Sequence, residues 1–347
     1  MRVLIIKTSS LGDIIHTYPA LTDAVRAIPD IRFDWLVEES FIDLPLLHPA
    51  VDEVIALPWR RLRKRLFSLD SWRELASLRR RLQSKHYDLV IDAQGLLKSA
   101  IWTRLINAPI HGLASDSARE PLASHFYQIT HSVAWGQHAI TRVRELFAKA
   151  LAYPLPNMDE TDFHIAPKLR SIPSQQTHYW VFAHATTWES KHWPEAYWQA
   201  LILFARQQQR QVLLPWGNDE EHERAERLAR LTQHVEVLPK LELAAMTRVL
   251  AGAECVVGVD TGLTHLAAAL HRPVVAIYGA TEPGLTGVIG PKAKVLQAKF
   301  PCAPCMRERC IELTDQQLIP PCYEKDMSVQ RVSEAIQNLL DEGSHAN

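Results

Sequence analysis

The stretch Val256-Val-Gly-Val-Asp-Thr-Gly-Leu-Thr-His-Leu-Ala-Ala-Ala-Leu270 joins an apolar run to a helical run through a short polar turn. The apolar run ends at Val259, and its composition is typical of a buried strand. A helical run with small residues follows the turn Asp260-Thr-Gly262 at once. The segment therefore predicts a strand, a tight turn and a helix whose N-terminus opens at the carboxyl end of the strand.

This turn has the features of an anion site. The first backbone N–H groups of a helix have no partner within the helix, and the helix dipole is positive at that end. Gly262 lets a ligand approach the backbone, while Thr261, Thr264 and His265 can add side-chain donors. An ordinary strand–helix turn capped by Asp260 or Thr261 explains the same residues. Evidence from the rest of the sequence is therefore needed to distinguish the two interpretations.

The composition indicates a globular protein with two domains. A chain of 347 residues is too long for one ordinary core. The apolar fraction of 47% and the charged fraction of 22% are typical of globular proteins, and a formal net charge of −1 creates no overall attraction to nucleic acid or membrane. No apolar run approaches the roughly 18 residues of a membrane span, and Met1–Lys7 is too short for a signal peptide. We therefore expect a cytoplasmic protein.

The order of strand followed by helix recurs through most of the chain. In the first half, the expected strands are Val3–Lys7, Phe33–Val37, Glu53–Leu57, Leu89–Asp92 and Pro109–Leu113. The expected helices between them are Ile14–Ile28, Ser71–Ser84 and Lys98–Ile106. This alternation predicts an α/β fold with a parallel sheet and helices on both of its faces.

The second half repeats the alternation. Its expected strands are Trp180–His184, Val212–Trp216, Cys255–Val259 and Val274–Tyr278. Its expected helices are Glu195–Gln208, Glu220–Leu231, Glu242–Ala251 and Leu263–Leu270. A polar segment with two prolines separates the halves and reads as a linker.

These patterns predict a domain over residues 1–165, a linker over 166–178, a second domain over 179–325, and a C-terminal helix with a tail over 326–347. The helix is expected over Ser328–Leu340, followed by a frayed tail from Gly343. We expect two doubly wound, Rossmann-like domains facing each other across a cleft. Ligands would then bind at the carboxyl ends of both sheets.

The first strand–helix junction, Lys7-Thr-Ser-Ser-Leu-Gly-Asp-Ile-Ile-His-Thr-Tyr-Pro-Ala20, carries a candidate catalytic carboxylate. Gly12 permits a tight turn, and Asp13 falls at the start of the following helix, where it can accept a proton from a bound hydroxyl. A helix-capping aspartate is the alternative interpretation. The dinucleotide fingerprint G-x-G-x-x-G is absent from this junction.

Two further turns in the second half carry candidate ligand-binding residues. In the segment His184–Glu195, Thr186, Thr187 and Lys191 can hold phosphate oxygens, although Lys191 can equally be a solvated loop residue. In the segment Leu213–His222, Glu220 or Glu221 can accept hydrogen bonds from ribose hydroxyls. Acidic residues at the start of a helix also complement its dipole, which is the alternative for this pair.

A dense basic run, Arg60-Arg-Leu-Arg-Lys-Arg65, lies between Trp59 and Phe67. From Trp59 to Arg104 there are twelve Lys or Arg residues and four Asp or Glu residues, an excess of eight positive charges. Such a stripe can bind an anionic lipid headgroup or nucleic acid, or can be a solvated helix face. No sequence pattern of a nucleic-acid-binding module accompanies it, so nucleic acid is the weaker prediction.

Four of the five cysteines lie near the C-terminus, at Cys302, Cys305, Cys310 and Cys322, with the spacing C-x2-C-x4-C-x11-C. Paired thiols at such spacing can bind zinc. Reduced loop cysteines or a redox-labile pair are the alternatives, and zinc is not favoured because a second C-x2-C half is missing. Cys255 lies in the apolar strand and is expected to be a packed thiol.

Taken together, several segments resemble the ADP-heptose:lipopolysaccharide heptosyltransferases, which are inverting glycosyltransferases of the GT-B fold. The resemblance covers nearly the whole chain and is nearest to the branch that adds the first heptose to the Kdo of Kdo2–lipid A. The segments that carry it are Lys7–Asp13, Ile91–Lys98, Ser117–Ala123, Thr186–Pro194, Leu214–Gly217 and Val259–His265.

The resemblance assigns a role to each candidate residue. Asp13 would be the general base on the Kdo hydroxyl, and Thr186, Thr187 and Lys191 would hold the ADP diphosphate. Glu221 would contact the ribose. The sugar-nucleotide pocket would comprise Asp260, Thr261, Gly262, Leu263 and His265. Kdo carboxylates and lipid A phosphates would meet Arg60, Arg61, Arg63, Lys98 and Arg119.

The resemblance implies transfer of heptose from ADP-L-glycero-D-manno-heptose to the Kdo of Kdo2–lipid A, by an enzyme peripherally associated with the inner face of the cytoplasmic membrane. No cofactor is required, because no D-x-D pair follows a strand and Lys191 with two helix N-termini can neutralise the departing ADP. The cysteine cluster occurs in some relatives and not in others. The alternatives are a heptosyltransferase II, or a related sugar-nucleotide enzyme with a different acceptor or none.

Overall fold

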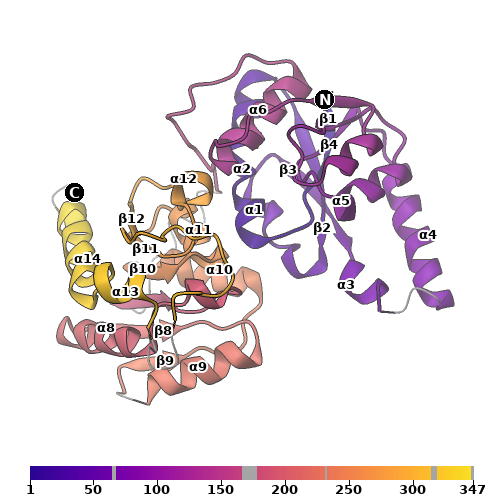
Figure 1. Cartoon of the computed structure of the whole chain (residues 1–347). Helices are drawn as coiled ribbons and strands as arrows, with labels where there is room; N and C mark the ends of the chain where they lie inside the picture. Colours follow the sequence, from indigo (N-terminus) through magenta and orange to yellow (C-terminus); the bar gives the residue numbers. More distant parts are fainter. Residues whose placement is uncertain (65–67, 166–177, 231–232, 314–318, 345–347) are drawn as a thin grey trace. The chain divides into compact units, whose positions relative to one another are not determined.

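The computed structural model describes residues 1–64, 68–165, 178–230, 233–313 and 319–344. The chain divides into two compact units, Met1–Ala166 and Pro167–Asn347, which are coloured along the sequence in Figure 1. Apart from His178, the linker expected over 166–178 lies outside the described residues. Each unit is an α/β domain with its own parallel sheet, as the alternation of strands and helices predicts.

The first unit contains a six-stranded parallel sheet. Its strand order is β3-β2-β1-β4-β5-β6, and neighbouring strands pair in parallel throughout. The strands are β1 (Arg2–Ile6), β2 (Arg32–Glu38), β3 (Val51–Leu57), β4 (Leu89–Asp92), β5 (Ile110–Leu113) and β6 (Ile129–His131). The order reverses between β1 and β4, which is where doubly wound sheets bind ligands.

Helices cover both faces of the first sheet. Successive strand residues point to opposite sides, and apolar residues on each side pack against helices. Leu4 and Ile6 lie in one core with α4 and η3, whereas Phe33 and Trp35 contact Phe147 of α6 and Tyr18 of α2 on the other face. The α-helices are α1 (Leu11–Ile15), α2 (Tyr18–Ala27), α3 (Trp59–Leu62), α4 (Leu69–Gln83), α5 (Leu97–Ala100) and α6 (Ala139–Leu151). The 3-10 helices are η1 (Glu39–Phe41), η2 (Pro45–Leu47), η3 (Ile101–Leu105) and η4 (Pro121–Phe126).

The second unit repeats this topology with its own strands, in the order β12-β11-β10-β7-β8-β9. All of its strand pairs are parallel. The strands are β7 (Tyr179–Ala183), β8 (Gln211–Leu214), β9 (Val235–Val237), β10 (Cys255–Val259), β11 (Val274–Tyr278) and β12 (Ala293–Gln297). The order reverses between β7 and β10, so the segment Val256–Leu270 lies at the topological switch point of this sheet.

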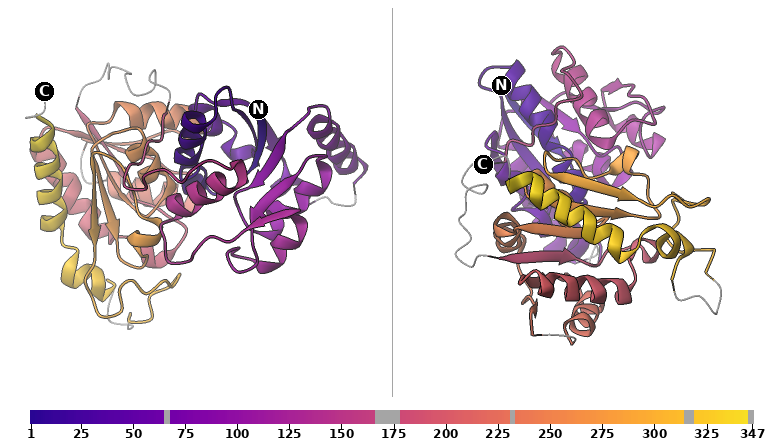
Figure 2. Two further views of the ribbon diagram at one scale, coloured as in Figure 1. Left: turned by 90° about the horizontal axis from the view of Figure 1, so that it is seen from above. Right: turned by 90° about the vertical axis from the view of Figure 1, so that its left-hand side faces the viewer.

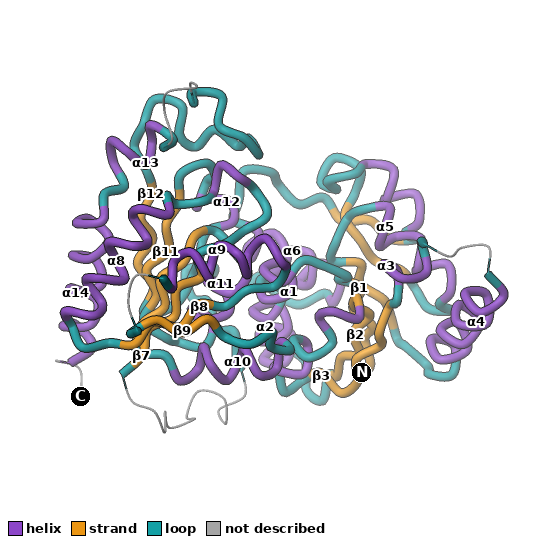
Figure 3. The backbone as a smooth tube through the Cα atoms, turned by 90° about the horizontal axis from the view of Figure 1, so that it is seen from below, coloured by secondary structure: helices purple, strands orange, loops and turns teal. Residues whose placement is uncertain are grey.

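The helices of the second unit also flank both faces of its sheet (Figure 3). One face packs a core of Trp180, Phe182, Val257 and Ile277 against α8, α9 and α14, and α14 lies beside α8 (Figure 2). The helices are η5 (Glu189–Lys191), α8 (Glu195–Gln207), α9 (Asp219–Ala229), α10 (Leu243–Gly252), α11 (Gly262–Ala269), α12 (Pro283–Thr286), α13 (Pro321–Asp326) and α14 (Val329–Ser344).

The structure corrects several predicted elements. The helix expected over Ile14–Ile28 is two helices, because Pro19 lies at the start of α2 and a proline cannot continue a helix from the preceding turn. The helix expected over Lys98–Ile106 changes to 3-10 geometry after Ala100. Gly343 lies within α14 rather than in a tail. The sequence analysis did not predict α3, β6, α6, β9, β12, α12 and α13.

Among the described residues, none of the helices combines the length and the apolar character that crossing a bilayer would require.

Candidate functional site

Asp260 is the centre of a polar cluster at the carboxyl ends of β7 and β10, which we call the second-unit site. Lys191 Nζ lies 2.8 Å from Asp260 Oδ2, and the Thr281 hydroxyl donates to the same oxygen at 2.8 Å. His265 Nε2 lies 3.4 Å from Asp260 Oδ1. Thr186 Oγ1 donates to the Asp260 backbone oxygen at 3.0 Å. The structure therefore brings together four of the predicted residues from two turns, with Thr281 from a third.

The environment keeps Asp260 ionised. Burial opposes its charge, but the hydrogen bond with His265 and the nearby Lys191 ammonium outweigh burial and lower the pKa of Asp260 to about 2. The side chains of Lys191 and Asp260 are only 16% and 10% exposed. Lys191 is thus held beside a carboxylate and next to the Trp188 ring, 4.5 Å from its centroid. An incoming phosphate can compete with Asp260 for this ammonium group.

The turn itself is built as an anion site. Thr261 is the N-cap of α11 and is extended, but its side chain makes no capping hydrogen bond. The Thr264 hydroxyl instead donates to the Val259 carbonyl at 2.8 Å. The first N–H groups of α11, on Gly262 and Leu263, have no intrahelical acceptor by the geometry of any helix start. They can therefore bind an anion.

Gly258 explains how close α11 comes to the strand before it. A Cβ on Gly258 would lie 2.1 Å from Thr264 Oγ1 and 3.0 Å from the Ala183 side chain. Only glycine leaves room for the hydroxyl that ties α11 to β10. Gly258 is not among the predicted site residues, although a glycine inside an apolar strand is a signal of close backbone approach.

The loop after β7 positions the predicted threonines. His192 Nε2 lies 2.8 Å from the Thr186 oxygen and 3.2 Å from its nitrogen, which fixes the loop around Thr186. Thr187 is exposed in the same loop. Neither His192 nor Thr281 was predicted, and Thr281 follows a strand that the sequence analysis did not associate with the site.

Glu221 has a local structural role in this structure. Its carboxylate accepts from the Gly217 N–H at 2.7 Å, and its own N–H donates to the Asn218 side chain at 2.9 Å. These contacts cap α9 at the end of β8, the strand beside β7. Within the described residues, no hydrogen bond or ion pair joins Glu221 to Asp260 or Lys191. The predicted ribose contact therefore stays a prediction.

A second polar cluster, the first-unit site, lies at the carboxyl ends of β1 and β4. Gln94 clamps the loop after β1, because its side-chain oxygen accepts from the Thr8 N–H at 2.9 Å and its amide donates to the Ser9 carbonyl at 2.6 Å. Lys98 Nζ lies 2.5 Å from Ser9 Oγ, and Lys7 Nζ donates to the Ala93 carbonyl at 2.8 Å. The clamp by Gln94 was not predicted.

Asp13 lies at the start of α1, where it caps the helix as one of the two interpretations predicts, and its catalytic role stays a prediction. Its Oδ2 accepts from the Ser10 N–H at 2.9 Å and from the Ser10 hydroxyl at 3.0 Å, which caps the helix. Within the described part of the chain, no hydrogen bond is made by Oδ1. One carboxylate oxygen therefore orients the side chain, and the other is available to accept a proton from a bound hydroxyl.

Two buried ionisable groups shape the surroundings of Asp13. Lys7 is almost entirely buried, and burial lowers the pKa of its ammonium group while Asp13 and Asp92 favour its charge. Burial raises the pKa of Asp92, against hydrogen bonds from Gln94 and Tyr127. Through the bonds of Lys7 to the Ala93 carbonyl and of the Gln94 N–H to Asp92, these groups fix the geometry of the loop after β4.

The five cations predicted to bind the acceptor differ in whether they already have an ion-pair partner. Lys98 belongs to the first-unit site. Arg119 lies next to Glu120 in the chain. The Glu120 carboxylate accepts from the Leu97 N–H at 2.6 Å, which ties the segment of Arg119 to the start of α5. Arg60 pairs with Glu38 at 2.7 Å. Arg119 is exposed and has no ion pair within the described residues.

The last two of these five cations, Arg61 and Arg63, also differ in whether they form an ion pair. Arg61 pairs with Glu39 at 2.9 Å and with Glu74 at 2.6 Å. Arg63 is exposed and has no ion pair in the part of the chain that the structure describes. Arg65 lies outside the described residues. Part of the positive charge of the run is therefore neutralised by glutamates that are distant in sequence.

The four C-terminal cysteines are free thiols. Cys302, Cys305 and Cys310 are partly exposed, and Cys322 is buried. Burial raises the pKa of the Cys322 thiol to about 11, and the other three cysteines add to the shift. Among the described residues, no group of three or more ligating side chains is arranged to hold a metal ion. A zinc site stays an untested possibility.

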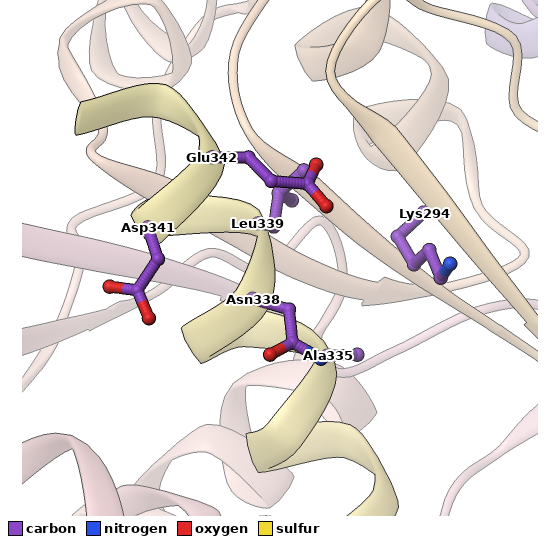
Figure 4. Close-up of a pocket in the computed structure, with 6 residues that line it drawn as sticks. All are labelled: Lys294, Ala335, Asn338, Leu339, Asp341 and Glu342. Atoms are coloured by element: carbon purple, nitrogen blue, oxygen red, sulfur yellow. The ribbon is translucent and has the colours of Figure 1, made fainter. Parts of the chain in front are cut away.

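A surface groove of about 310 Å³ lies between α14 and β12 (Figure 4). Its lining residues are Lys294, Ala335, Asn338, Leu339, Asp341 and Glu342. Lys294 is the second residue of β12, so the groove is at the amino ends of the strands. The predicted ligand sites lie at the opposite, carboxyl edge, and the groove is not part of them.

Comparison with known proteins places the chain in one family. The model of glycosyltransferase family 9 (heptosyltransferase) matches residues 75–314. Lipopolysaccharide heptosyltransferase 1 of Pseudomonas aeruginosa is 49% identical, over 98% of this chain and 98% of that protein. By contrast, lipopolysaccharide heptosyltransferase 2 of Salmonella typhimurium is 24% identical over 99% of both chains. The chain is therefore much less similar in sequence to heptosyltransferase 2 than to heptosyltransferase 1.

Solved structures agree with this placement. Escherichia coli heptosyltransferase WaaC with ADP has a TM-score of 0.86 and 46% identity, covering 98% of this chain and 100% of its own. The same enzyme with ADP-2-deoxy-2-fluoro heptose has a TM-score of 0.82 and 45% identity, covering 97% and 99%. The chain therefore has the GT-B architecture of two Rossmann-like domains, and it belongs to glycosyltransferase family 9, the heptosyltransferases.

Proposed function

We propose that this enzyme transfers heptose from ADP-L-glycero-D-manno-heptose to the Kdo of Kdo2–lipid A, with inversion at the anomeric carbon. The observation that carries the proposal is the second-unit site, where Lys191, Asp260, His265 and the start of α11 converge at a switch point. A relative of 45% identity has been solved with a fluorinated ADP-heptose. That relative supports the same donor class for this chain.

On the donor side, the diphosphate would bind the N–H groups at the start of α11, the Lys191 ammonium and the hydroxyls of Thr186 and Thr187. Lys191 would exchange its contact with Asp260 for the phosphate as charge develops on the departing ADP. Such preorganised donors stabilise a leaving anion without a metal ion. Glu221 would release Gly217 or share its second oxygen to contact the ribose.

On the acceptor side, Asp13 would accept the proton of the attacking Kdo hydroxyl through Oδ1, which makes no hydrogen bond within the described residues. Ser10 holds the other oxygen and so fixes the carboxylate. Lys98, Arg119 and Arg63 would meet the carboxylates and phosphates of the acceptor. Arg60 and Arg61 would do so only after leaving their glutamate partners.

The reaction is then a single displacement. The bond from the acceptor oxygen to the anomeric carbon forms while the bond from that carbon to the ADP oxygen breaks on the opposite face. The hydroxyl proton passes to Asp13, and the electron pair of the broken bond leaves with ADP. Holding both reactants in line supplies much of the rate enhancement, and exclusion of water limits donor hydrolysis.

The acceptor is a lipid, so we infer that the enzyme works peripherally at the inner face of the cytoplasmic membrane.

The test of the proposal is whether ADP release depends on the acceptor. We expect ADP to appear from ADP-heptose only when Kdo2–lipid A is added, in an amount equal to the glycosylated acceptor. A sugar-nucleotide epimerase would convert the donor without any acceptor. Conversion of ADP-heptose at the same rate with and without Kdo2–lipid A would therefore contradict transferase activity.

A further inference from the structure

Helix α4 (Leu69–Gln83) has two opposite faces of different character. Its inner face, with Leu78 and Leu82, is buried against the first sheet. Leu69 and Trp72 lie one turn apart outside this buried stripe, with 77% and 62% of their surface exposed. Figures 1 and 2 both show α4 at the periphery of the first unit. Among the described residues, a large aromatic and a large aliphatic side chain are therefore mostly exposed on this helix.

Arginines flank these two side chains. Helical spacing places Arg73, Arg79 and Arg80 on the same outer face as Trp72, and all three are exposed. Among the described residues, Arg73 pairs only with Asp70, at 3.3 Å, and both side chains are largely exposed to solvent. Within the described residues, Arg79 and Arg80 have no ion pair. The outer face of α4 therefore presents uncompensated positive charge beside exposed apolar surface.

Helix α3, which carries the first two arginines of the adjacent basic run, is less available for an anionic partner. Arg60 and Arg61 of α3 are already paired with Glu38, Glu39 and Glu74. Among the described residues of the run, Arg63 and Lys64 are exposed and have no ion pair, and α4 adds Arg79 and Arg80, which are in the same state. An electrostatic contact that needs no rearrangement is therefore better provided by α4 than by α3.

We propose that the outer face of α4, comprising Leu69, Trp72, Arg73, Arg79 and Arg80, is the surface that rests on an anionic lipid bilayer. The inference rests on the proposed function, because a lipid-linked acceptor is presented at a membrane surface. Tryptophan prefers the headgroup level of a bilayer, and arginines beside it bind lipid phosphates. A helix that carries apolar and basic side chains on one exposed face is suited to lie in this interface.

Charge complementarity argues for a bilayer as the partner. The whole chain has a formal net charge of −1, so attraction to an anionic surface has to come from a local patch such as this one. Nucleic acid would account for the arginines but would give no role to Leu69. A bilayer accounts for both kinds of side chain.

The test is cosedimentation of the full-length protein with vesicles of phosphatidylcholine, alone or mixed with phosphatidylglycerol. We expect binding to the mixed vesicles that R79Q/R80Q weakens by more than tenfold, since each arginine near an anionic surface contributes about a fivefold factor. W72A should weaken it severalfold. The control R230Q/R248Q removes the same charge from exposed positions of the second unit, and L203A removes a residue of α8 that is 43% exposed. Both controls should bind within about twofold of the wild type.

Two results would overturn the inference: α4 variants that bind vesicles as well as the controls do, or wild-type protein that binds a homopolymer RNA in preference to the mixed vesicles. A deacylated, water-soluble Kdo acceptor separates the inference from the proposed function. The α4 variants should use it at the wild-type rate and lose turnover only with Kdo2–lipid A in vesicles. If the wild type transfers nothing to either acceptor while vesicle binding still depends on α4, the proposed function fails and the surface assignment stands.

Discussion

At the scale of single residues, different atoms of one side chain make different contacts, so a structural role leaves room for the proposed chemical one. Asp13 uses Oδ2 to cap α1 through Ser10 and leaves Oδ1 without a hydrogen bond in the described structure. Asp260 holds Lys191 and Thr281 on Oδ2 and faces His265 with Oδ1. The capping and catalytic interpretations that the sequence left open for such residues are therefore compatible.

Asp13→Asn should separate the two roles. The amide oxygen can still accept from the Ser10 N–H, so α1 stays capped, but the amide cannot take a proton. We expect kcat to fall by about 10²- to 10⁴-fold, with ADP affinity by calorimetry within about twofold. The control Ser10→Ala loses part of the cap and keeps the carboxylate, so it should retain most of the turnover. An Asp13→Asn enzyme with more than a tenth of wild-type kcat would exclude Asp13 as the base.

The Lys191–Asp260 pair should make stability depend on pH at the acid end. The folded-state pKa of Asp260, about 2, is below its ordinary value of 3.8, so its contribution is full above that ordinary value and is lost as pH falls towards 2. Lys191→Met should raise this pKa and remove up to about 2 kcal/mol of stability at neutral pH. Lys299→Met, which removes an exposed lysine, is the control.

Urea denaturation at a series of pH values measures this effect. The difference in unfolding free energy between wild type and Lys191→Met should be largest near neutral pH and should shrink below about pH 4. A difference that is the same at every pH, or one that Lys299→Met reproduces, would show that the ion pair does not control the titration of Asp260.

At the scale of elements, the strand–turn–helix units place the chemistry, and the sequence predicted those that alternate clearly. The sequence predicted that Asp260 and Lys191 lie in turns after the strands β10 and β7. The carboxyl ends of these two strands are neighbours at the switch point of the sheet. It missed α6, and it missed the short edge strand β12, in which Leu296 is the one buried residue and no clear alternation of polarity marks a strand. It could not predict that Gln94 clamps Ser9 or that Arg61 pairs with Glu39, because such contacts depend on which strands become neighbours.

Gly258→Ala tests the close approach of α11 to β10. The added methyl group would collide with the Thr264 hydroxyl, which cannot move without losing its bond to Val259. We expect a loss of about 1–3 kcal/mol in unfolding free energy and weaker ADP binding, because the start of α11 is displaced.

Gly217→Ala is the matched control for stability. The nearest atom to its added Cβ would be the flexible carboxylate of Glu221, at 3.3 Å. Chemical denaturation should show a much smaller loss for this variant. Equal losses for the two glycine variants would indicate a general cost of replacing glycine rather than a specific contact between the strand and the helix.

At the scale of the whole molecule, the chain uses one topology twice and gives each copy a different polar cluster. Both sheets have the same strand order relative to the chain, yet the first carries Asp13 and Lys98 at its switch point and the second carries Asp260 and Lys191. The repeated order accounts for two ligand sites in one protein. Their different residues suit the proposed division of roles, with anion binding in one copy and proton acceptance in the other.

The most direct test of this account is analysis of the product formed from ADP-heptose and Kdo2–lipid A by wild-type enzyme. Mass spectrometry should show a single heptose added to the acceptor, and NMR of the new linkage should show an anomeric configuration opposite to that of the donor. A product with retained configuration, or heptose released to water with the acceptor unchanged, would contradict a single displacement at these two sites.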